Sequence, residues 1–324
     1  MRSSYSVSAD LWNGVQIFSL CQEGLGHARV APQWGDNCFS FVVGGQPILE
    51  PVSLEQFSER PTSYGIPILF PFPNRVRDGS FMFRGERYRV QPNRHGFVRD
   101  KKWEVLGSGA SGRDGAWVTS RLRADDYPEE ILDQFPFPFE LEVTHRLKDG
   151  CLELTTEIRN TGSTEIPCGF GLHPYFSCSE AATIQIPARK RWELSENLPT
   201  GRLFPVEGSF DLRAPTSVHG ILLDDIFTDL VAEGEGLVRC KLRDPVKAVE
   251  ITVEFDVRDF PHAVVYKPPA PRRALCIEPY TCPTDGFNLQ ERGIEANMMV
   301  LKPGESKRLR VRVCARVLEW LATR

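Results

Sequence analysis

Apolar and polar residues alternate with a period of two over long stretches of the chain, a pattern typical of strands that bury one face. The clearest case runs from residue 141 to residue 147, where every second side chain is apolar or histidine. Asp149 and Gly150 follow, and the alternation resumes over residues 152–159. Because an Asp-Gly pair tolerates the positive φ of a tight turn, this region predicts a β-hairpin.

Several other segments repeat this pattern over shorter lengths. Strands are expected at residues 81–83, 88–90, 249–256 and 309–317, and short helices at 53–59 and 125–134. Many short strands separated by turn residues favour an all-β chain folded as a large antiparallel β-sandwich. No internal repeat, low-complexity linker or shift of charge divides the sequence, so a single domain over residues 1–324 is expected.

Composition narrows the classes of function. The 324 residues include 26 Gly and 25 Pro, a mild excess that suits a turn-rich chain. Lys and Arg number 39 against 43 Asp and Glu, and no basic block stands out, so neither nucleic acid nor an anionic membrane is an expected partner. No apolar run approaches the ~18 residues of a membrane span, and the start of the chain lacks the apolar core of a secretion signal. The common motifs of nucleotide-binding proteins, serine hydrolases and zinc proteases do not occur.

The nine cysteines are scattered along the chain, with no Cys-x-x-Cys pair and no Cys/His cluster of metal-ligand spacing. An odd number of dispersed cysteines in a chain with a large core predicts reduced thiols in a cytoplasmic protein. A nucleophilic or metal-binding cysteine is the less favoured alternative, so no metal site is expected.

The histidines differ in their surroundings. His145 lies on the apolar face of its strand, which predicts a packed, hydrogen-bonded core histidine. Pro174 cannot donate a ladder hydrogen bond, so a strand should end or bulge beside His173, where the ring can point into a cleft. An ordinary surface turn is the alternative for that segment. His95 lies in a polar loop that enters a strand, and His219 lies either near a site or merely at a turn.

Two carboxylates stand apart from the many that solvent should surround. Glu278 ends an apolar strand directly before Pro279, where partial burial would raise its pKa and suit it to proton transfer. Asp224 lies in an acidic pair inside an apolar run, either as a turn cap or as part of a site. Asn74 and Arg75 lie in a proline-fixed loop, suited to donate to sugar hydroxyls or an anion, or else to pin the loop.

These segments occur in an order that resembles the aldose 1-epimerase (galactose mutarotase) family. The resemblance runs from about residue 60 to residue 290 and rests on Pro73-Asn74-Arg75, His95-Gly96-Phe97, Gly171-Leu172-His173-Pro174-Tyr175-Phe176, Asp224 with Phe227, and Ile277-Glu278-Pro279. It implies a large antiparallel β-sandwich of the galactose mutarotase-like, supersandwich type, with a sugar cleft on one sheet.

The resemblance also implies a role for each candidate residue. His173 would be the general acid and Glu278 the general base. Contacts to the sugar hydroxyls or the ring oxygen would come from Asn74, Arg75, His95, Tyr175 and Asp224. Val264 stands where these enzymes often carry a glutamine, so one sugar contact is expected to be lost or replaced. Whether His219 or Tyr266 joins the site is left open.

The chemistry of anomerisation agrees with these roles. A base removes the proton of the C1 hydroxyl while an acid protonates the ring oxygen, and the opened sugar rotates about C1–C2 before it recloses. A carboxylate and an imidazole suit these two transfers, and no metal, nucleotide or redox cofactor is required. The sequence therefore predicts an isomerase, a cofactor-independent aldose 1-epimerase whose partner is a free small-molecule sugar.

Other functions stay open at this point. A hexose-6-phosphate 1-epimerase would need basic residues at the rim of the cleft, which Arg77, Arg94 and Arg99 are able to supply. A non-catalytic carbohydrate-binding or sugar-sensing protein is opposed by the presence of both proton-transfer candidates. A glycoside hydrolase or lyase would need a second carboxylate near the cleaved bond, for which Asp224 is the only candidate. Neither the identity of the aldose nor the oligomeric state follows from the sequence.

Overall fold

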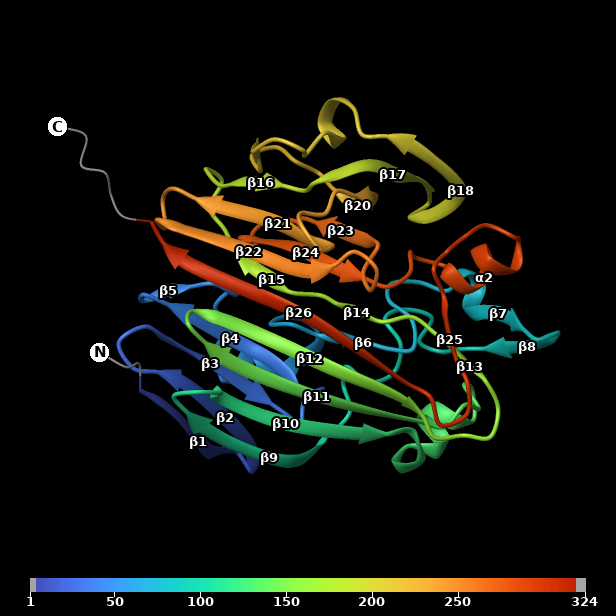
Figure 1. Cartoon of the computed structure of the whole chain (residues 1–324), viewed down its shortest axis with the longest axis horizontal. Helices are drawn as coiled ribbons and strands as arrows, with labels where there is room; N and C mark the ends of the chain where they lie inside the picture. Colours follow the sequence, from blue (N-terminus) through green and yellow to red (C-terminus); the bar gives the residue numbers. More distant parts are fainter. Residues whose placement is uncertain (1–3, 319–324) are drawn as a thin grey trace.

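The computed structural model describes residues 4–318 and confirms the all-β class, since antiparallel sheets dominate these residues (Figure 1). The nine-stranded sheet has the order β19 (Thr216–Ser217), β16 (Thr183–Gln185), β21 (Leu237–Asp244), β22 (Val249–Asp256), β26 (Ser306–Val317), β12 (Cys151–Asn160), β11 (Phe139–Lys148), β10 (Gly115–Arg123) and β9 (Glu104–Ser111). The eight-stranded sheet has the order β18 (Leu198–Pro205), β17 (Ala188–Ser195), β20 (Asp224–Leu230), β23 (His262–Tyr266), β24 (Ala274–Tyr280), β14 (Gly171–Leu172) and β6 (Ile68–Leu69), and its β15 (Tyr175–Ser177) pairs with β24.

Three smaller sheets complete the strands of this part of the chain. The five-stranded sheet follows the chain order β1 (Tyr5–Trp12), β2 (Val15–Gln22), β3 (Gly26–Ala31), β4 (Asn37–Val43) and β5 (Gln46–Pro47). Two further pairs are β13 (Ile166–Cys168) with β25 (Met299–Leu301), and β7 (Ser80–Phe83) with β8 (Glu86–Arg89).

Helical segments among the described residues are short. They are α1 (Leu54–Glu59), α2 (Gly286–Glu291), 3₁₀ turns at Pro61–Ser63, Arg77–Gly79, Ala124–Asp126 and Gly208–Phe210, and a π turn at Pro128–Leu132. α1 confirms the helix expected over residues 53–59, and Ser53 and Gln56 form a reciprocal capping box at its start. No helix within residues 4–318 is long and apolar enough to cross a membrane.

The prediction of a helix over residues 125–134 is wrong about the type of structure, because the chain forms a 3₁₀ turn followed by a π turn there. Pro128 has no N–H and disfavours the helical conformation of the residue before it. Tyr127 accordingly has a φ of −137°, which interrupts any continuous α-helix.

The inner face of the nine-stranded sheet shares its core with both other large sheets. Leu154 of β12, Ile277 of β24 and Phe41 of β4 are all buried and belong to one continuous hydrophobic cluster. This arrangement confirms the antiparallel β-sandwich. The single domain over residues 1–324 stays a prediction, and its two ends, 1–3 and 319–324, lie outside the described residues.

β11 and β12 form the predicted hairpin within the nine-stranded sheet (Figure 1). Their register runs from Phe139 opposite Asn160 to Lys148 opposite Cys151. Asp149 and Gly150 make the turn with φ values of 50° and 71°. The Asp-Gly signal in the sequence therefore located the turn correctly.

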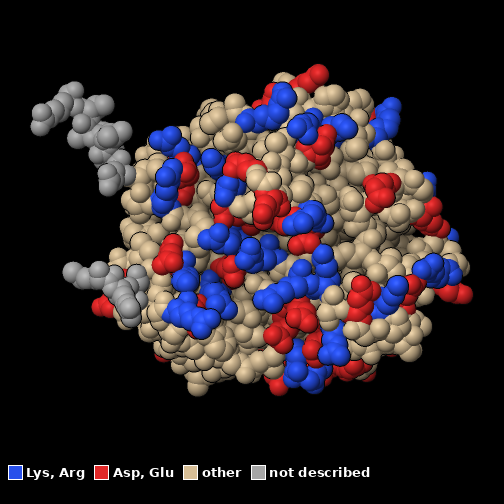
Figure 2. All heavy atoms as spheres, viewed as in Figure 1, with Lys and Arg blue, Asp and Glu red and all other residues tan. Residues whose placement is uncertain are grey.

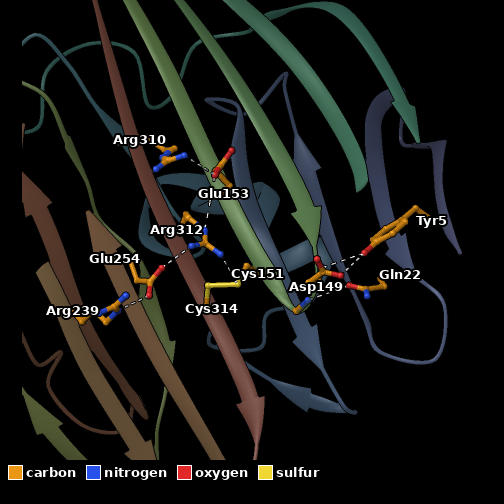
Figure 3. Close-up of a disulfide and its surroundings, with 11 residues drawn as sticks. Tyr5, Gln22, Asp149, Cys151, Glu153, Arg239, Glu254, Arg310, Arg312 and Cys314 are labelled. Carbon is orange, nitrogen blue, oxygen red and sulfur yellow. Dashed lines mark hydrogen bonds and ion pairs between the residues drawn. A yellow bond between two sulfur atoms is a disulfide. The ribbon is translucent and has the colours of Figure 1, made fainter. Parts of the chain in front are cut away.

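A disulfide bond joins β12 to β26 through Cys151 and Cys314 (Figure 3). The two residues are 163 positions apart in sequence, yet the antiparallel register sets them directly opposite, with Cα atoms 4.0 Å apart. The expectation that all cysteines are reduced is therefore wrong for this pair, because only strand pairing reveals that they face each other. The other seven cysteines are free thiols.

Charged side chains of both signs cover the outer face of the nine-stranded sheet (Figure 2). Beside the disulfide, Arg312 donates to Glu254 of β22 at 2.9 Å and lies 4.0 Å from Glu153 of β12 (Figure 3). Partly exposed ion pairs of this kind add little to stability. The free energy of folding therefore comes mainly from the apolar inner face.

His145 interrupts the apolar inner face of β11. Its Nε2 lies 3.0 Å from Oδ2 of Asp36, and both side chains are inaccessible to solvent. The predicted hydrogen-bonded core histidine is confirmed, with a partner that the sequence did not reveal.

We expect His145→Ala to lower the free energy of unfolding by about 3 kcal/mol or more, because Asp36 is left buried without its partner. Urea unfolding followed by circular dichroism measures this change. Glu142→Ala is the matched control, since Glu142 lies on the outward face of the same strand and its loss should change the free energy by less than about 0.5 kcal/mol. Equal losses in the two variants would contradict a special contribution of the buried pair.

Candidate active site

The eight-stranded sheet carries a row of four side chains across four neighbouring strands. Tyr175 of β15 lies opposite Cys276 of β24, Cys276 lies opposite Tyr266 of β23, and Tyr266 lies opposite Asp224 of β20. Residues directly opposite each other in an antiparallel pair point to the same face. Asp224 is thus the first residue of a strand rather than a turn cap, and it shares a face with Tyr175.

The two faces of β24 have different surroundings. Leu275 and Ile277 join the main core, whereas Cys276, Glu278 and Tyr280 point to the opposite face. Glu278 is buried, and Tyr280 Oη donates a hydrogen bond of 2.5 Å to its Oε2. The period-two geometry of one strand therefore sets this carboxylate beside its hydrogen-bond donor.

His173 lies at the break that Pro174 predicts, between β14 and β15. The backbone N–H of His173 donates a hydrogen bond to the carbonyl oxygen of Pro67, with the nitrogen and oxygen 3.0 Å apart. Its imidazole stacks on the Tyr175 ring with centroids 4.6 Å apart, and Nε2 lies 3.4 Å from Oε1 of Glu278. The break in the strand therefore directs the buried imidazole at the buried carboxylate.

Asn74 and His95 lie in two loops that pair with each other beside His173. Both residues have positive φ, 54° and 65°, and the His95 N–H donates to the Asn74 carbonyl oxygen at 2.6 Å. Arg75 and Arg94 form an isolated antiparallel bridge between the loops. The ring centroids of His95 and His173 are 5.4 Å apart, so the loop pair forms one side of the site.

Guanidinium groups hold the two loop side chains. Arg75 Nη1 donates to Asn74 Oδ1, and Arg94 Nε donates to His95 Nε2, each at 3.0 Å. Because Nε2 of His95 accepts a hydrogen bond, the ring proton of the neutral imidazole is on Nδ1. Within residues 4–318, Nδ1 of His95 and Nδ1 of His173 are buried without a partner.

Two glycines make this packing possible. A Cβ at Gly171 would lie 2.6 Å from the Tyr280 ring, so a larger residue would push that ring away from Glu278. A Cβ at Gly96 would lie 1.9 Å from the carbonyl oxygen of Phe70, at a φ of 65° that already favours glycine.

Burial shifts the two central groups in opposite directions. Desolvation raises the pKa of Glu278 well above its usual range, although the hydrogen bond from Tyr280 lowers this pKa. The negative charge of Asp224 raises the pKa of Glu278 further. Desolvation lowers the pKa of His173 to about 3, and the positive charge of Arg94 adds to that effect. Glu278 therefore holds a proton more firmly, and His173 less firmly, than the same groups in water.

The structure brings the seven predicted site residues to this one region: Asn74, Arg75, His95, His173, Tyr175, Asp224 and Glu278. Tyr266 joins them, with its ring centroid 6.0 Å from that of His173. His219 does not contact them, because it is exposed and its Nδ1 lies 3.3 Å from Oε2 of Glu180. The roles of these residues in binding and proton transfer stay predictions.

Reasoning from the sequence missed Cys276, Tyr280 and Arg272. The signal for the first two was present, since both alternate with Glu278 along β24. Arg272 gave no local signal, because its guanidinium reaches the Tyr175 ring, 4.5 Å from the centroid, only in the folded chain.

Val264 makes one wall of the site apolar. It lies opposite Glu278 on β23 and packs with Trp192 and Ile226 in a separate hydrophobic cluster. The position where the resemblance led us to look for a glutamine therefore offers a bound sugar no hydrogen bond.

A buried imidazole–carboxylate pair on one sheet of a large β-sandwich supplies the two kinds of group that general acid–base chemistry uses. The sequence model of the aldose 1-epimerase family matches residues 19–314, and the chain belongs to that family. Among curated relatives, the uncharacterized protein YihR of Escherichia coli is 26% identical over 263 residues, which cover 78% of this chain and 79% of YihR.

Solved structures confirm the galactose mutarotase-like fold. A galactose mutarotase-like protein from Clostridium acetobutylicum matches with a TM-score of 0.85 at 23% identity, over 97% of this chain and 99% of that one. The galactose 1-epimerase of Lactobacillus acidophilus matches with a TM-score of 0.77 at 16% identity, over 98% and 100% of the two chains. At such identities the likeness establishes the fold, and the chemistry has to be argued from the site.

We expect Tyr280→Phe to raise the pKa of Glu278 further, because the lost O–H donor stabilises the ionised carboxylate. A ¹³C NMR titration of protein labelled at the glutamate carboxyl carbons measures this pKa, and Glu278→Gln identifies the resonance. An unchanged or lowered pKa in Tyr280→Phe would contradict the assigned hydrogen bond.

Proposed function

We propose that this protein is a cofactor-independent aldose 1-epimerase, an isomerase that interconverts the α- and β-anomers of a free aldose. The observation that carries the proposal is the buried contact of 3.4 Å between His173 Nε2 and Glu278 Oε1. Membership of the aldose 1-epimerase family over residues 19–314 supports the reaction class. The likeness in fold to the galactose 1-epimerase of Lactobacillus acidophilus agrees with it.

In the proposed reaction, Glu278 accepts the proton of the C1 hydroxyl and His173 donates a proton to the ring oxygen. The bond between C1 and the ring oxygen breaks, the open aldehyde rotates about C1–C2, and the ring recloses with the two roles reversed. A carboxylate of raised pKa is a stronger base, and an imidazolium of lowered pKa is a stronger acid. The same shifts disfavour the carboxylate and the imidazolium themselves, so the reacting pair is the less populated form of the site.

The residues around this pair are proposed to hold the sugar. Asn74 and Arg75 offer amide and guanidinium donors, and His95 offers its Nδ1, which has no hydrogen-bond partner among residues 4–318. Tyr175 and Asp224 belong to the row across the sheet. Fixed polar groups on both sides of the ring would orient C1 and the ring oxygen toward the pair.

The proposal includes neither a cofactor nor a metal in the reaction, because proton transfers alone complete it. The partner is a small-molecule sugar, with neither nucleic acid nor membrane involved. It remains a prediction that residues 1–324 act as one domain. A location in the cytoplasm is also a prediction, and it rests on the seven free thiols rather than on the Cys151–Cys314 pair.

Glu278→Gln and His173→Asn should each slow anomer exchange by at least about 10²-fold, because each removes one proton-transfer group. NMR exchange spectroscopy of glucose and galactose measures the rate, and circular dichroism checks the fold. His219→Asn is the control, since this exposed histidine should leave the rate unchanged. A normal rate in either site variant would refute the role of that residue, whereas sugar binding by calorimetry without exchange in the wild type would favour a non-catalytic protein.

Positive charge beside the pair favours one second candidate, a hexose-6-phosphate 1-epimerase. Arg94 and Arg99 both lower the pKa of His173 through their charge, and within residues 4–318 the Arg94 side chain donates a hydrogen bond through Nε alone. Arg77, the third predicted rim residue, is instead bound to Asp285 through its backbone N–H and its Nε. Two of the three arginines thus remain available to an anionic group.

If the substrate is phosphorylated, Arg99→Gln should raise the KM for glucose 6-phosphate by about 10-fold and change that for glucose little, because a charge-assisted contact is lost. Steady-state exchange kinetics with both sugars separate the two candidates. Arg77→Gln is the control and should leave both KM values unchanged. If the protein exchanges the anomers of glucose but not those of glucose 6-phosphate, the phosphate-specific enzyme is excluded.

A further inference from the structure

A side chain with no part in the sugar reaction lies beside the proposed catalytic pair. One ligand atom from each of His173, Cys276 and Glu278 lies within 4.8 Å of the others, and all three residues are buried. Among residues 4–318 no other group of three or more histidine, cysteine or acidic residues meets this geometry. The proton transfers proposed above give Cys276 no task.

Strand register holds the thiol at the pair. Cys276 and Glu278 are two residues apart on β24, so their side chains share a face. On one side Cys276 pairs with Tyr175, whose ring stacks on His173 at 4.6 Å, and on the other side it pairs with Tyr266. No hydrogen bond from or to Sγ occurs within residues 4–318, so the sulfur is available as a ligand.

This set of donors suits Zn²⁺. Thiolate, imidazole and carboxylate are its usual protein ligands, with metal–ligand distances of about 2.0–2.3 Å. Sites in which three protein ligands and one solvent molecule surround the ion are common. Ligand atoms on a tetrahedral ion are about 3.5 Å apart, and His173 Nε2 and Glu278 Oε1 already lie 3.4 Å apart. Because the three ligand atoms lie within 4.8 Å of one another, the sulfur has to approach the other two by at most about 1.3 Å.

The residues next to His173, Cys276 and Glu278 would hold these three side chains in position around a bound ion. The Tyr280 hydrogen bond to Oε2 of Glu278 leaves Oε1 facing His173. Contacts that orient metal ligands in this way strengthen metal binding. A thiolate and a carboxylate also carry the two negative charges that offset those of Zn²⁺, which matters because Arg94 and Arg272 bring positive charge close to His173.

We propose that His173, Cys276 and Glu278 form a Zn²⁺ site that competes with the sugar for the catalytic pair. When the ion binds, the thiol proton and any proton held by the other two ligands pass to solvent. With its imidazole and carboxylate coordinated, the protein can no longer transfer protons to a sugar. The inhibition rests on the proposed function, whereas the metal site rests on the geometry alone.

Co²⁺ tests the metal site without any sugar. Titration of the metal-free wild type should produce visible ligand-field bands and a thiolate-to-cobalt charge-transfer band, and added Zn²⁺ should abolish them. Cys276→Ser should lose the charge-transfer band. Cys240→Ser, which changes a buried cysteine of β21 outside the group, should keep it. A wild type without the band, or a band that persists in Cys276→Ser, would overturn the site.

Zn²⁺ titration of anomer exchange tests the inhibition. The wild type should lose activity as Zn²⁺ rises and regain it with a chelator. With each rate expressed as a fraction of the same protein's metal-free rate, Cys276→Ser should need at least about 10-fold more Zn²⁺ than the wild type for the same fractional loss. Equal sensitivity of the two proteins would overturn the inhibition. If no sugar exchanges at all, the proposed function and the inhibition both fail, and the cobalt spectra still decide the metal site.

Discussion

The arrangement of this protein depends most on one energetically unfavourable feature, which is that an imidazole and a carboxylate are buried next to each other. His173 and Glu278 are 3.4 Å apart and almost inaccessible to solvent. Removing such groups from water costs several kcal/mol for each ion, and the cost shows as a raised pKa for Glu278 and a lowered pKa for His173. The Tyr280 hydrogen bond and the Tyr175 ring offset part of it. Strongly perturbed pKa values of this kind are typical of groups that transfer protons, and for that reason we place the proposed chemistry here rather than at the solvated carboxylates.

The rest of the fold keeps this pair in place. On β24, Ile277 enters the core shared with the nine-stranded sheet, while the next residue, Glu278, faces the site. Any shift of that core would therefore move the carboxylate. The loops that carry Asn74 and His95 hold both residues at positive φ, which costs of order 1 kcal/mol each. Backbone bonds between the loops and the Gly96 contact with Phe70 stabilise this conformation.

Local signals in the sequence were reliable wherever the decisive interaction is local. The Asp149-Gly150 turn, the capped helix after Ser53 and the strand break at Pro174 were predicted correctly, because each depends on neighbouring residues. The α-helix expected over 125–134 was wrong because Pro128 outweighs the helix-forming residues around it. The reduced state of Cys151 was wrong for a different reason, since its partner lies 163 residues away.

By itself, the sequence determined the all-β class, the inward position of His145 and the residue types able to perform acid–base chemistry. It also indicated the family, because the characteristic segments occur in a recognisable order. Only the tertiary structure decided which strands are neighbours, and so which side chains meet. Alternation states which face a residue occupies, whereas the pairing of β24 with β15 and β23 depends on contacts between segments far apart in sequence. For that reason the row of Tyr175, Cys276, Tyr266 and Asp224, and the cysteine beside the proposed catalytic pair, could be found only in the folded chain.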